Sequence, residues 1–111
     1  MTYGTFKHLY SEALEHKSID LYIMERGWQE WMNDMSADDI VVALKKIYHI
    51  ANSEDKWGAL CEEFSNRSVI SNLYCIPQRT LQNWDLGKRS PSEYLIMLIA
   101  YTVINDLCEK R

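Results

Sequence analysis

Polar residues of the types that read nucleic acid are concentrated in one stretch, residues 66–91, which reads NRSVISNLYCIPQRTLQNWDLGKRSP. Gln and Asn can form paired hydrogen bonds with a base edge, and Arg and Lys hold guanine or phosphate oxygens. These residue types therefore indicate contact with a nucleic-acid duplex. An enzyme is poorly supported, because no histidine–carboxylate pair accompanies a nucleophile and no phosphate-binding glycine loop occurs. We predict a protein that is not an enzyme.

The first half of this stretch predicts a helix over residues 66–74. Asn66 would cap it, and Ile70 and Tyr74 would face the core with the small Ser71 between them. The sequence CIP at residues 75–77 then breaks the helix, because proline disfavours a helical conformation in the residue before it.

The second half predicts a helix over residues 78–86, with Leu81 and Trp84 facing inward. Two helices joined by a turn of three or four residues form a helix-turn-helix. The second helix would then expose a set of polar side chains, namely Gln78, Arg79, Gln82 and Asn83.

This stretch resembles the helix-turn-helix of the phage repressor and Cro type (the XRE-like class). That class typically shows Ser/Thr-Gln-x-[Ser/Thr]-Ile-x-x-Trp-Glu-x-Gly-Lys-Arg-x-Pro, and residues 77–91 here read PQRTLQNWDLGKRSP. The resemblance covers about residues 64–111, and WDLGKRSP is its most specific part. Cys75 replaces the usual glycine at a turn position that needs a positive φ, and Pro77 replaces the usual Ser or Thr cap.

The resemblance implies roles in binding DNA. At the start of the recognition helix, Gln78 would contact a base edge and Arg79 would reach guanine or phosphate, while Asn83 would read a second base. The other members would hold phosphate, or a base where the docking angle allows. The complete implied set is Asn66, Arg67, Gln78, Arg79, Thr80, Gln82, Asn83, Lys88 and Arg89.

Charge is distributed unevenly along this chain, whose net charge is −4. Residues 1–63 contain 6 basic and 12 acidic residues, whereas residues 64–111 contain 6 basic and 4 acidic residues. The basic excess lies in the predicted reader. The acidic excess supports an alternative, a protein-binding module in which the helix-turn-helix is a scaffold. Its acidic N-terminal surface would imitate DNA or dock a basic partner, as small phage-encoded inhibitors (anti-CRISPR proteins among them) tend to do.

Apolar residues at helical spacing also predict helices over residues 5–17, 18–26, 36–51, 53–64 and 92–111. We therefore expect an all-α multi-helix bundle that contains the helix-turn-helix. Accessory helices in residues 1–52 would pack on a helix-turn-helix domain in residues 53–111, together forming one compact unit. A cluster of Trp28, Trp31 and Met32 is interpreted either as core or as a partner surface.

The composition predicts a cytoplasmic protein without a membrane segment. The three cysteines lack C-x-x-C spacing, and the longest apolar run, residues 94–101, is too short to cross a bilayer. No cofactor or metal is expected, since His8, Glu12 and His16 are interpreted as a solvated helix face. We expect a transcriptional regulator from a bacterium or a mobile element such as a phage. It would bind double-stranded DNA as a homodimer, because two half-sites about 34 Å apart increase specificity.

Overall fold

The computed structural model describes residues 1–64 and 67–109, with side chains described as far as residue 105 in the last helix. Only helices, turns and loops occur in these ranges, so the predicted all-α fold is confirmed. Their order is α1 (Tyr3–Glu15), α2 (Ile19–Met24), a short 3-10 helix η1 (Glu30–Met32), α3 (Ala37–Asn52), α4 (Lys56–Cys61), α5 (Arg67–Tyr74), α6 (Gln78–Asp85) and α7 (Glu93–Glu109).

Hydroxyl side chains set the starts of the first three α-helices. Ser18 caps α2 and Ser36 caps α3, at the first residues of the ranges predicted for these helices, and each accepts a hydrogen bond from the N–H group three residues later. The start of α1 differs from the predicted range, residues 5–17. Thr2 fills that position and accepts from the N–H of Thr5, so α1 begins earlier than expected.

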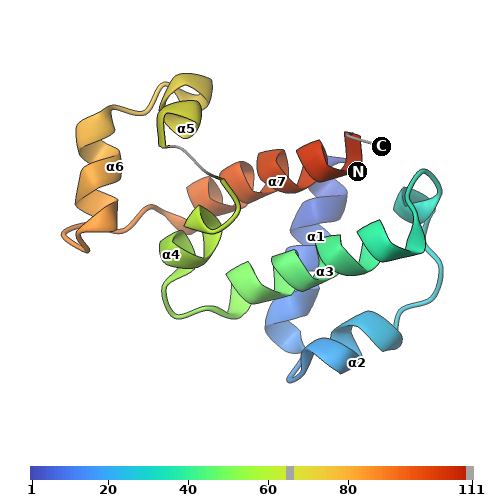
Figure 1. The fold of residues 1–111 in the computed structure, drawn as a ribbon. Helices are drawn as coiled ribbons and strands as arrows, with labels where there is room; N and C mark the ends of the chain where they lie inside the picture. Colours follow the sequence, from blue (N-terminus) through green and yellow to red (C-terminus); the bar gives the residue numbers. More distant parts are fainter. Residues whose placement is uncertain (65–66, 110–111) are drawn as a thin grey trace.

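The core lies where α1, α3, α4 and α7 pack together, and Figure 1 shows α1 running across α3 and α7. Residues from both predicted segments, 1–52 and 53–111, belong to this one hydrophobic cluster. Its largest fully buried side chains include Phe6, Leu9, Tyr10, Leu44, Ile47, Leu60, Ile96 and Ile99. Tyr94 begins the longest apolar run of the sequence, yet this residue in the first turn of α7 is 66% exposed. The helices that pack on α7 therefore cover only part of its circumference, and one side of its first turn faces solvent.

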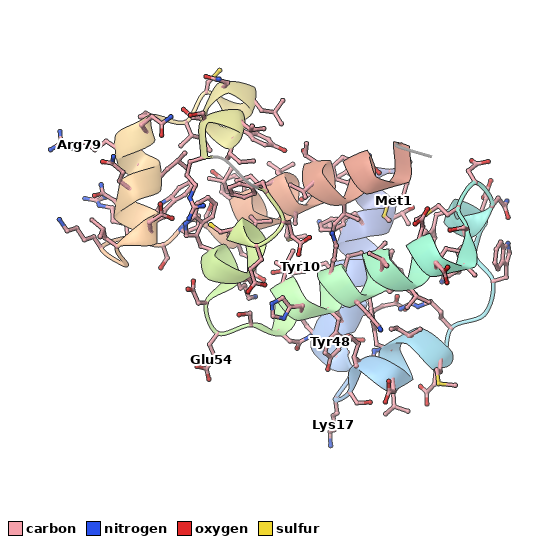
Figure 2. The ribbon with its side chains drawn as sticks, in the orientation of Figure 1. Met1, Tyr10, Lys17, Tyr48, Glu54 and Arg79 are labelled. Carbon is pink, nitrogen blue, oxygen red and sulfur yellow. The ribbon has the colours of Figure 1, made fainter. Side chains whose placement is uncertain are left out.

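Polar contacts join three helices near the middle of the molecule, where Figure 2 shows Tyr10. The Tyr10 hydroxyl and the Lys56 ammonium both donate to Oε1 of Glu93, at 3.1 and 2.9 Å. The hydrogen bond from Lys56 lowers the pKa of Glu93, whereas burial raises the pKa of Tyr10. These contacts hold α1 and α4 to the first turn of α7.

The molecule is elongated, with principal extents of 43 × 30 × 21 Å. Figure 1 shows α5 and α6 at one end and α2 toward the other. Within the described residues, no helix has the length and apolar character needed to span a membrane. The stretch with the predicted reading residues thus lies away from α2.

Candidate nucleic-acid interface

A tight turn at residues 75–77 joins α5 to α6. Cys75 has a φ of 55°, so the structure confirms the positive φ predicted at this position. The Ile76 N–H donates to the Ser71 carbonyl at 3.0 Å, and the Ser71 hydroxyl donates to the Ile76 carbonyl at 2.6 Å. A small hydroxyl residue at position 71 therefore closes the turn, which sets the direction in which α6 leaves α5.

The first of these two helices is tied to the core through its last residue. The Tyr74 hydroxyl donates to the Leu98 carbonyl of α7 at 2.9 Å and also contacts the Thr102 hydroxyl. Ile70, one turn earlier, is fully buried. These contacts orient α5 as the sequence predicts, with Ile70 and Tyr74 facing inward.

Pro77 precedes α6 and gives it no side-chain cap. Its carbonyl accepts the N–H groups of Thr80 and Leu81, at 3.0 and 3.3 Å. The first turn of α6 therefore has no side-chain acceptor from its cap residue. Such a helix start favours an anion, because its N–H groups carry the positive end of the helix dipole.

Two apolar side chains fix the rotation of α6. Leu81 is fully buried, and Trp84 is half-buried with its ring edge-to-face against Trp57 of α4, at a centroid distance of 5.0 Å. The opposite face then points to solvent. Gln78, Arg79 and Gln82 on this face are exposed, as the sequence predicts, but the prediction is wrong for Asn83, which is half-buried.

Backbone hydrogen bonds end α6 and position the two basic residues that follow it. Gly87 has a φ of 75°, and its N–H donates to the Trp84 carbonyl at 3.2 Å. The Lys88 N–H donates to the Asn83 carbonyl at 3.0 Å, which completes a Schellman motif. The exposed side chains of Lys88 and Arg89 are thus attached directly to the last turn of α6.

An ion pair joins the two ends of the α5–α6 unit. The Arg67 guanidinium contacts the Asp85 carboxylate through Nη2–Oδ1 at 2.9 Å and Nε–Oδ2 at 3.3 Å. The Trp57 indole N–H donates to the same Oδ1 at 2.8 Å. These hydrogen bonds, Arg67 first and then Trp57, lower the pKa of Asp85. The sequence does not predict this contact, because the spacing of Trp57, Arg67 and Asp85 carries no signal that pairs them.

The charge of this unit is positive once the pair is taken into account. Residues 67–92 contain four basic residues and one acidic residue. Asp85 is neutralised by Arg67, which leaves the cationic side chains of Arg79, Lys88 and Arg89. Figure 2 shows Arg79 extending from α6 away from the rest of the molecule.

The predicted site residues fall into three groups in the structure. One group lies on α6, and its exposed members share a face because residues 3 and 4 apart are neighbours on a helix. Lys88 and Arg89 follow that helix, and Arg67 lies on α5 inside the ion pair. Asn66 is outside the described residues. The α6 group comprises Gln78, Arg79, Gln82 and the half-buried Thr80 and Asn83.

The histidine-bearing face of α1 is occupied by contacts within the protein. His8 Nε2 lies 3.6 Å from the Glu12 carboxylate, and His16 Nδ1 lies 2.8 Å from the Glu12 carbonyl. Among the described residues, no group of three or more His, Cys, Asp or Glu side chains is arranged to hold a metal ion.

Comparisons with models of protein families, with curated proteins and with solved structures found no match for this chain. Its function is therefore inferred from its own side chains and geometry.

Proposed function

We propose that this chain is a small DNA-binding protein, a transcriptional regulator that reads the major groove with α6. It would use α5 and α6 as a helix-turn-helix of the phage repressor and Cro type, in the cytoplasm of a bacterial host. The observation that carries the proposal is the exposed polar face of α6. A buried Leu81 fixes this face outward, at one end of an elongated molecule.

In this docking geometry the N-terminal residues of the second helix reach deepest into the groove. Gln78 and Arg79 occupy those positions, and Gln82 lies one turn beyond Gln78 on the same face. Gln suits adenine and Arg suits guanine, because each can make two hydrogen bonds to the base edge. Asn83 is half-buried, so we assign it a supporting contact near the rim of the groove.

Phosphate contacts are assigned to Lys88 and Arg89, which leave the last turn of α6. Arg67 already pairs with Asp85, so its main role in this proposal is to position α6. Three remaining cations per copy predict a log–log salt dependence with a slope of about −3. The proposal includes a homodimer, because two half-sites about 34 Å apart increase specificity. Binding of two copies would roughly double the slope.

Fluorescence anisotropy with genomic and random duplexes at low salt tests the proposal. Arg79→Ala should weaken binding by about 1–3 kcal/mol, since a bidentate guanine contact is lost. The matched control is Lys17→Ala, which removes one positive charge at a position that Figure 2 shows far from Arg79. If Arg79→Ala and Asn83→Ala bind as tightly as Lys17→Ala, α6 is not the recognition helix.

The alternative is a protein-binding module whose acidic half is the working surface. An exposed tryptophan in that half, Trp28, favours it, because tryptophan is enriched at protein interfaces. Retention on heparin distinguishes the two functions. A DNA reader is retained and elutes steeply with salt, whereas a protein that works only through its acidic surface flows through.

A further inference from the structure

Three large apolar side chains are exposed within eight residues of the N-terminal half. Leu21 is 47%, Met24 is 81% and Trp28 is 69% exposed. Leu21 and Met24 lie one turn apart on the same face of α2, and Trp28 follows in the segment after that helix. We call these three residues the Trp28 surface.

The sequence allows Trp28, Trp31 and Met32 to belong either to the core or to a partner surface. The structure places these three residues differently. Met32 is buried and Trp31 is half-buried, so both contribute to packing. Trp28 does not, although its indole N–H is satisfied by a 2.7 Å hydrogen bond to Oδ1 of Asn33. That bond holds the ring in place and leaves its apolar faces in water.

The segment that carries Trp28 is fixed by a nearly buried arginine. Arg26 Nη1 donates to Glu12 at 3.1 Å and to Gln29 Oε1 at 3.2 Å. The same Gln29 oxygen accepts the Trp31 indole N–H at 2.7 Å. An exposed apolar group on a segment held by such hydrogen bonds loses less conformational freedom on binding, which favours affinity.

Carboxylates surround the Trp28 surface in the sequence. Residues 18–36 contain four acidic residues and one basic residue, Arg26, which is paired with Glu12. In the described part of the chain, none of the four takes part in an ion pair. All four are exposed, namely Asp20, Glu25, Glu30 and Asp34.

We propose that the Trp28 surface docks a partner protein whose contact area is apolar at the centre and rich in lysine and arginine at the rim. Trp and Met are enriched at the centres of interfaces, and opposite charges at the rim select the partner and speed its encounter. A second copy of this chain fits poorly. A two-fold pairing would place the same carboxylates against each other, and like charges across an interface are unfavourable.

The location of this surface leaves the candidate nucleic-acid interface free. Figure 1 shows α2 and α6 well separated in the elongated molecule. A partner on α2 and a duplex on α6 would therefore bind at the same time. The docking proposal stands independently of DNA binding, because none of its residues belongs to α5 or α6.

Binding of a synthetic amphipathic helical peptide to the full chain tests this proposal. The probe has leucine on one face and lysine on the other, and its matched control carries glutamate in place of lysine. By anisotropy of the labelled peptides at low salt, only the lysine peptide should bind. Trp28→Ala should weaken it by about 30-fold, as for an interface hot spot, and Met24→Ser should weaken it less. Exchanging Asp20 and Glu25 for Lys should abolish binding.

Leu73→Ser is the matched control for the apolar substitutions. Leu73 is 55% exposed on α5, a helix without an acidic residue, so its loss should leave peptide binding unchanged. Equal binding of the two peptides, or an equal loss with Leu73→Ser, would overturn the proposal. A self-associated species in sedimentation that Trp28→Ala dissolves would also overturn it, because the surface would then belong to a second copy. Neither measurement involves DNA, so failure here is distinct from failure of the regulator proposal.

Discussion

At the scale of single residues, Asp85 connects the candidate interface to the fold. One carboxylate accepts from Arg67 of α5 and Trp57 of α4 while it ends α6. The sequence identifies Asp85 only as part of a family-like motif, because pairing between residues 18 and 28 positions apart has no periodic signal. It does predict Leu81 and Trp84 as inward-facing, because helical spacing alone separates them from the polar face.

Asp85→Asn should reduce stability by roughly 1 kcal/mol at neutral pH, since the pair is partly exposed and screened by solvent. Arg67 lowers the folded-state pKa of Asp85 below its unfolded value. The pair therefore stabilises the fold above the unfolded pKa, and this contribution is lost as the pH falls below about 4 toward the folded pKa. Urea unfolding across pH 3–7 should show the wild-type and Asp85→Asn stabilities converge in acid.

The control for this pH series is Asp34→Asn, which removes the same charge from an exposed residue outside any ion pair in the described ranges. It should leave the pH dependence of unfolding unchanged. Matching curves for Asp34→Asn and Asp85→Asn would show that the Arg67–Asp85 contact contributes nothing to stability.

At the scale of elements, two left-handed residues determine where α5 and α6 end. The positive φ at Cys75 follows from the family resemblance, since glycine usually fills that turn position, and Gly87 serves the same purpose after α6. Other boundaries were less predictable. Thr2 and Thr5 both carry a hydroxyl that could cap α1, so the sequence leaves the start of this helix ambiguous. In the structure Thr2 is the cap.

Cys75→Gly should make the protein about 0.5–1 kcal/mol more stable than Cys75→Ala. A side chain in the left-handed region costs about 1–2 kcal/mol, of which part is offset by the larger unfolded-state entropy of glycine. Both variants remove the thiol, so only the backbone effect differs between them. The measurement is the midpoint of urea unfolding for each variant, compared where the dependence of the unfolding free energy on urea concentration is the same. Equal midpoints would mean that the turn at residue 75 is not strained.

Gly87→Ala should destabilise the protein by about 1 kcal/mol, because its φ of 75° disfavours a Cβ atom although the space around it is open. Gly27→Ala is the matched control. Gly27 also has open space, but it lacks the left-handed φ, so alanine there should be neutral or slightly stabilising. The melting temperatures of the two variants, compared with that of the wild-type protein, test both predictions. An equal effect at the two sites would contradict the Schellman ending of α6.

At the scale of the whole molecule, opposite charges are separated along the chain. The net charge of −4 hides a unit, residues 67–92, with four basic residues and one acidic residue. This separation could be read from the sequence. The position of α6 at one end and the exposure of Trp28 could not, because both depend on how helices that are distant in the sequence pack on one another.

The central claim is that DNA binds to the outer face of α6. Titration of the ¹⁵N-labelled protein with a duplex, followed in amide spectra, tests this claim residue by residue. We predict that the largest shifts occur at Gln78, Arg79, Gln82, Lys88 and Arg89, while the amides of α2 and Trp28 stay unchanged. Shifts that gather on α2, or unchanged amides throughout α6 at saturating duplex, would contradict the account.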